Sequence, residues 1–95
     1  MPQSTMGSPG TMIRSVTKDN SADIPTQTIQ GVKYYPRAIL VMHDGSAVSD
    51  VELIGINDGD TATVIRNIPS GSVIPLQTKR ILDNSTTATN IYAIY

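Results

Sequence analysis

The choice of apolar side chains constrains this chain more than any other feature of its sequence. Ile, Val and Thr supply 30 of the 95 residues, whereas Leu occurs four times and Phe and Trp are absent. β-Branched side chains are stiff at their first torsion and pack well on a pleated surface. A helical domain would draw more heavily on Leu, Ala, Glu and Lys. The composition therefore predicts an all-β protein.

Beyond Ile24, short apolar stretches alternate with turn-forming residues at the spacing of roughly 8–12 residues that is typical of a small sandwich or barrel. Apolar residues never recur at i, i+3, i+4 and i+7 over three turns, so no substantial helix is expected. Pro75 marks a strand edge or a bulge. The predicted fold is a small antiparallel β-sandwich or barrel of about six strands. These strands are expected over residues 28–34, 37–43, 51–56, 61–68, 73–82 and 87–95.

The composition changes near Ile24. Residues 1–23 are rich in Pro, Gly, Ser and Thr, a composition typical of a flexible segment. We therefore expect an extended N-terminal arm over residues 1–23 and a β-sandwich domain over residues 24–95. Such an arm can lie in a groove or add a strand to a neighbouring sheet. Its candidate contact residues, for a partner or a neighbouring subunit, are Met6, Met12, Ile13 and Val16.

A core without Phe or Trp is thin, and no disulfide can support it because the chain has no cysteine. Neighbouring subunits are therefore expected to supply part of the burial, which predicts a homo-oligomer. The last strand alternates Ile91, Ala93 and Tyr95 on one face with Tyr92 and Ile94 on the other, so both faces are apolar. Such a strand is either central in a sandwich or covered by another chain. The candidate subunit-packing residues are Tyr34, Tyr35, Tyr92 and Tyr95.

Charge and motif content exclude several function classes. A net charge of −1 lacks the basic excess that phosphate neutralisation needs, so nucleic-acid binding is not expected. No apolar run approaches the ~20 residues that cross a bilayer, so no membrane span is expected. The single histidine, His43, is expected at the surface or at a strand end. No nucleophile is expected beside it, so it is not a candidate for catalysis. The aspartates lie in predicted turns, where they are typical turn formers. We expect no catalytic residue, no cofactor and no metal, and therefore no enzyme.

Four segments of the chain match motifs of one known family. Residues 71–76 are similar to a G-x-I-L-P-V segment, and residues 85–95 are similar to a closing T-T-A-T-x-I-x-A-L-Y strand, with Ile94 in place of Leu. Residues 16–25 are similar to an early V-T-P-S-D-S-x-D-L-P segment, and residues 37–41 to the A-L-Y-V strand that follows it. On these motifs, residues 16–95 resemble the spike-base proteins on the heads of gene transfer agents and tailed bacteriophages.

The resemblance implies a structural virion protein on the outer surface of a capsid, made in the host cytoplasm. It would be the base of a head spike or fibre at a capsid vertex, with the major capsid protein and a spike or fibre protein as partners. A pentamer on a five-fold vertex is expected, with a trimer as the alternative. Two other functions stay open: a cement or decoration protein spread over the shell, and a carbohydrate-binding module, for which four tyrosines without tryptophan make a poor platform.

Overall fold

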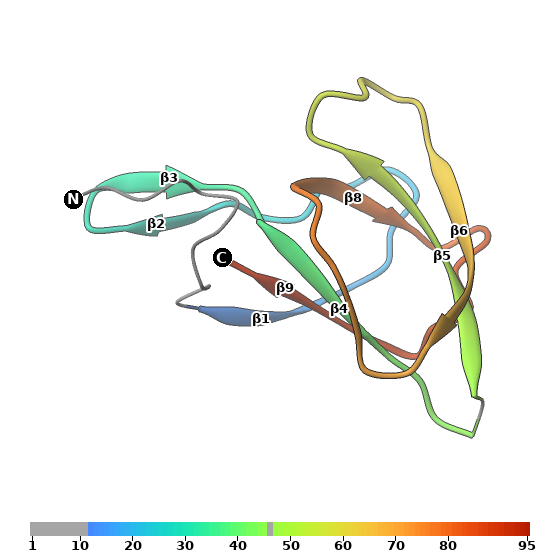
Figure 1. The fold of residues 1–95 in the computed structure, drawn as a ribbon. Helices are drawn as coiled ribbons and strands as arrows, with labels where there is room; N and C mark the ends of the chain where they lie inside the picture. Colours follow the sequence, from blue (N-terminus) through green and yellow to red (C-terminus); the bar gives the residue numbers. More distant parts are fainter. Residues whose placement is uncertain (1–11, 46) are drawn as a thin grey trace.

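The computed structural model describes residues 12–45 and 47–95, which form nine strands and no helix (Figure 1). All strand pairs are antiparallel, so the predicted all-β class is confirmed. No helix that could span a bilayer exists in this part of the chain. The strands are β1 (Ile13–Val16), β2 (Gln27–Ile29), β3 (Val32–Tyr34), β4 (Ala38–Met42), β5 (Val48–Gly55), β6 (Thr63–Pro69), β7 (Ser72–Ile74), β8 (Thr78–Leu82) and β9 (Asn90–Ile94).

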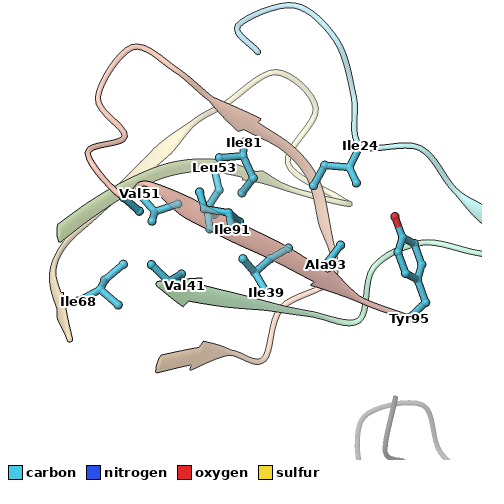
Figure 2. Close-up of a cluster of buried hydrophobic side chains, with 11 residues drawn as sticks. Ile24, Ile39, Val41, Val51, Leu53, Ile68, Ile81, Ile91, Ala93 and Tyr95 are labelled. Carbon is cyan, nitrogen blue, oxygen red and sulfur yellow. The ribbon is translucent and has the colours of Figure 1, made fainter. Parts of the chain in front are cut away.

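Two sheets enclose the core. The larger has the order β1-β9-β4-β7, and the smaller has the order β6-β5-β8. Alternate side chains of both sheets point inward, among them Ile39 and Val41 of β4 and Leu53 of β5, each at most 2% exposed. Figure 2 shows these residues meeting Ile91 and Ile81 in one continuous cluster. Branched aliphatic side chains therefore fill the sandwich, as the composition predicts.

Two of the six predicted strands are each divided in the structure. The stretch 28–34 is a hairpin, because Gln30 and Gly31 both have positive φ, 51° and 79°, as a tight two-residue hairpin turn requires. The stretch 73–82 breaks at Pro75, which cannot donate a ladder hydrogen bond. As a result β7 pairs with β4 in one sheet and β8 pairs with β5 in the other.

The described part of the predicted arm belongs to the folded domain. Strand β1 pairs with β9 along its whole length. The chain then crosses to the other sheet, where the Asp19 amide donates to the Ile81 carbonyl at 2.9 Å and the Ile24 amide to the Lys79 carbonyl at 2.8 Å. These bonds cover the edge of β8 that β5 leaves open. Residues 12–23 are therefore built into the fold that was expected to begin at Ile24.

The C-terminal residue closes the core. The Tyr95 side chain is 1% exposed, and its hydroxyl donates to the Pro25 carbonyl at 2.6 Å. Burial raises the pKa of this phenol, because the charged form loses its water. The Tyr95 side chain therefore links the end of β9 to Pro25, which precedes the hairpin of β2 and β3.

Replacing Tyr95 by Phe is expected to change how stability depends on pH. A raised folded-state pKa contributes stability that is present below the unfolded value of about 10 and is lost as pH rises through the folded pKa. Wild-type protein should therefore lose stability above about pH 10, and Tyr95→Phe should lose less there. At neutral pH the variant should lose about 1 kcal/mol with its hydrogen bond.

Denaturant unfolding at several pH values measures both effects. Tyr35→Phe is the matched control, because Tyr35 is 44% exposed. If both variants lose stability above about pH 10 as steeply as the wild-type protein, the raised pKa of Tyr95 is not the cause of that loss.

Candidate assembly surface

The outward side of the larger sheet carries the candidate functional surface. Residues opposite one another in an antiparallel pair share a face. One row aligns Ile13, Ile94 and Ala38, and the next aligns Ser15, Tyr92, Leu40 and Val73. A third row aligns Asn90 with Met42. We call the apolar members the apolar face: Ile13, Ala38, Leu40, Met42, Val73, Tyr92 and Ile94.

The apolar face is open to solvent and uncharged. Val73 is 52% exposed, Ile13 51% and Met42 38%, and the other members are half-buried. The polar residues that the strand registers place among them are Ser15 and Asn90, neither of which carries charge. Contiguous exposed apolar surface of this kind marks an interaction site in soluble proteins.

The outward side of the smaller sheet provides an internal comparison. Its registers place Glu52 beside Val64 and Leu82, and Arg80 beside Ile54. The Arg80 guanidinium lies 2.7 Å from the Asp23 carboxylate. Charged side chains therefore lie on this side, although Ile54 beside Arg80 is buried, at 1% exposure. The absence of charge on the apolar face is therefore a property of one sheet rather than of the composition as a whole.

A second apolar surface lies on the hairpin formed by β2 and β3, which projects from one end of the sandwich (Figure 1). Its register places Ile29 and Val32 opposite each other, on the same face as Tyr34. Ile29 and Tyr34 pack partly against the core, whereas Val32 is 52% exposed. Thr28 and Lys33 occupy the other face. An isolated two-stranded hairpin is marginally stable, so this one depends on what its apolar side contacts.

The four tyrosines expected to pack between subunits have different environments. Tyr92 lies on the apolar face and Tyr34 on the apolar side of the hairpin. Tyr35 is exposed, and its ring centroid lies 5.9 Å from the Lys33 ammonium. Tyr95 belongs to the core of the single chain, so its assignment to subunit packing is wrong. It faces inward because it continues the buried alternation of Ile91 and Ala93.

The arm residues expected to contact a partner also lie in different environments. Met6 lies outside the described residues. Met12 and Val16 pack against the chain's own core, because they occupy the inward positions of β1 and its approach. Ile13 points outward and joins the apolar face. Within residues 12–23, Ile13 is therefore the candidate contact residue that stays open to a partner.

Sequence reasoning missed Leu40, Met42 and Val73. A signal for the first two was present, because residues 38–42 form an unbroken apolar run in which inward and outward positions are both apolar. Such a run indicates a strand covered on both sides. Val73 had no comparable signal, because β7 is short and its partner strand is distant in the sequence.

Of the two positions expected for His43, surface or strand end, the structure shows the strand end. It follows β4 on the inward side, is 8% exposed, and has its Nδ1 at 2.9 Å from the Ser49 hydroxyl. Its Nε2 has no hydrogen-bond partner within the described residues. Ser49 is 5% exposed, so a substrate could not reach the pair. No cluster of three metal-binding side chains occurs in residues 12–45 and 47–95.

The Asp50 carboxylate bonds to a β-bulge near the start of β5. Arg66 and Asn67 of β6 together oppose the single residue Asp50. One Asp50 carboxylate oxygen lies 3.0 Å from the Arg66 guanidinium, and the other accepts the Asn67 amide at 3.0 Å. Asn67 has a φ of 59°, a conformation that Asn tolerates better than most residues. The Asp50 amide also donates to the Thr87 hydroxyl at 2.8 Å. Asp50 therefore links β5 to the bulge in β6 and to Thr87, which is a structural role.

Comparison with known proteins identifies a fold relative. No family model and no curated protein matches the sequence. Among solved structures, the chain is similar to a chain in the capsid of a native GTA particle computed with C5 symmetry, with a TM-score of 0.70 and 19% sequence identity. The match covers 95% of this chain and 88% of that chain. This protein therefore shares its fold, over nearly its whole length, with a chain from that capsid structure.

Proposed function

We propose that the protein is a structural, non-enzymatic virion component that forms the base of a spike or fibre on the outside of a capsid vertex. The observation that carries the proposal is the fold shared, over 95% of this chain, with a chain from a GTA capsid computed with C5 symmetry. The motifs similar to the spike-base family in residues 71–76 and 85–95 favour the same assignment.

The apolar face supports a role in assembly. A monomer in water gains nothing from presenting seven uncharged, largely apolar positions on one sheet, whereas a subunit in a shell or ring buries them. We propose a homo-oligomer, with a pentamer favoured over a trimer because a five-fold vertex matches the symmetry of the related particle. The partners would be the major capsid protein and a spike or fibre protein.

The proposal is tested by the presence and copy number of the chain in particles made by the cells that encode it. Particles are purified by density, and the chain is quantified against the major capsid protein by mass spectrometry. A vertex-restricted base gives a copy number far below that of the major capsid protein. Comparable numbers would favour the shell-wide cement function instead. Absence from the particles would contradict both.

Residues 1–11 are proposed to anchor the base to the capsid. Their deletion leaves β1 and its pairing with β9 in place, so the truncated chain is expected to fold and to form its oligomer. We expect it to be lost from purified particles, because a short anchoring segment can bind a partner through main-chain hydrogen bonds and a few apolar side chains. Immunoblotting of the particles measures occupancy, with light scattering of the free protein as the control. Full occupancy of the truncated chain would contradict the anchor.

A further inference from the structure

Two different apolar surfaces lie at different places on this molecule. The hairpin of β2 and β3 projects from the end of the sandwich at which β4 begins, and β4 then carries Met42 away from it (Figure 1). The apolar face spreads along β4 and its neighbours in the larger sheet. On the apolar side of the hairpin, Ile29 and Tyr34 pack against the core, whereas Val32, which pairs with Ile29, is open to solvent. Each surface is thus available to another molecule while the chain is folded.

We propose that the hairpin of one copy docks on the apolar face of the next copy, so that the copies join head to tail. The proposal rests on the oligomer in the proposed function and names the surfaces that form it. The hairpin gains the cover that a two-stranded unit needs, and the apolar face gains an apolar occupant.

The distribution of charge favours this pairing. Val32 lies with Ile29 on one side of the hairpin, and Lys33 lies on the other. Docking by the Val32 side therefore leaves the Lys33 ammonium in water and brings no charge onto the uncharged sheet. Burying an unpaired charge is strongly unfavourable. The same contact made by the opposite side of the hairpin would carry that cost.

Symmetry favours a head-to-tail contact over a face-to-face one. Two apolar faces that pair with each other form a closed two-fold dimer and leave both hairpins uncovered. A contact between two unlike surfaces repeats from copy to copy and closes into a ring when the rotation allows. The related fold occurs in a capsid structure with five-fold symmetry, which a ring of this kind can match.

Cysteine cross-linking tests the contact, because the chain contains no cysteine of its own. The double variants Val32→Cys/Met42→Cys and Val32→Cys/Val73→Cys are purified at high micromolar concentration and treated with a short bismaleimide. Denaturing gels are expected to show a ladder from dimer upward. Each single variant should stay monomeric, and a mixture of Val32→Cys with Met42→Cys or Val73→Cys protein should stop at the dimer.

A control pair on the other sheet and the single variants distinguish this contact from other contacts. Val48 is 44% exposed and lies on the other sheet, so Val32→Cys/Val48→Cys should give no ladder. A cross-linked dimer of Met42→Cys or Val73→Cys alone would indicate a face-to-face contact and overturn the proposal. The absence of any ladder from both double variants would also overturn it. Neither result affects the proposed function, which is tested by the presence of the chain in particles.

Discussion

Charging the apolar face with Met42→Glu and Val73→Glu is expected to remove the protein from particles while leaving the chain folded. Both side chains point away from the core and are 38% and 52% exposed, so each substitution should change the free energy of unfolding by no more than about 0.5 kcal/mol. In an apolar contact, each buried carboxylate without a partner costs several kcal/mol. Loss of assembly with retained folding therefore separates an interaction surface from a structural one.

Val48→Glu is the matched control for this experiment. Val48 is 44% exposed and pairs with Pro69 on the outward side of the smaller sheet. Circular dichroism checks the folding of both proteins, and quantitative mass spectrometry of purified particles measures incorporation. Incorporation of the double variant at the wild-type level would show that the apolar face is not used. Equal loss of the Val48→Glu control would show that any added negative charge excludes the chain.

Truncating Ile39 to Ala is expected to destabilise the fold far more than truncating its neighbour Leu40. Ile39 is fully buried between the sheets, and the loss of such a side chain costs about 2–5 kcal/mol through lost burial and the cavity left behind. A domain of this size has a total stability of roughly 5–15 kcal/mol. Leu40 faces outward on the same strand, so Leu40→Ala should cost about 1 kcal/mol or less in the monomer.

Urea unfolding of the two variants at low protein concentration provides the comparison. Consecutive residues of one strand share their backbone environment, so the difference between the variants reports which face is enclosed by the chain itself. Equal losses of stability would mean that something in the monomer covers Leu40 as well. The apolar face would then not be available for assembly.

The fold class could be predicted because it depends on local features. Stiff β-branched side chains and turn residues such as Asp44-Gly45 and Asn57 to Asp60 indicate strands and their ends without knowledge of what pairs with them. The two-faced apolar pattern of the last strand likewise predicted a strand that is either central or covered by another chain. In the structure, β9 lies between β1 and β4.

The features that were missed depend on pairing between distant segments. Strand β1 has the sequence Ile-Arg-Ser-Val, in which the inward positions alternate Arg14 with Val16, so no local apolar pattern reveals it. Its pairing of Ile13 with Ile94 joins the two ends of the described chain. Pro75 was recognised as an interruption, but its role in sending β7 and β8 to different sheets depends on partners that the sequence does not name.

The candidate surface could be predicted only in part for the same reason. Tyr92 and Ile94 were expected to face away from Tyr95's side of the last strand, and they do lie on the apolar face. The rest of that face becomes one surface only when β1, β4 and β7 are placed beside β9. His43 lies at a strand end as expected, but its burial was not predicted, because it follows from the inward alternation of β4.

A cryo-electron microscopy reconstruction of the intact particle, averaged with five-fold symmetry about a vertex, tests the central claim most directly. We predict density for a ring of this β-sandwich on the outer surface of the vertex, with the hairpin of each copy lying on the larger sheet of the next. The same fold distributed across the faces of the shell, or missing from the particle, would contradict the account.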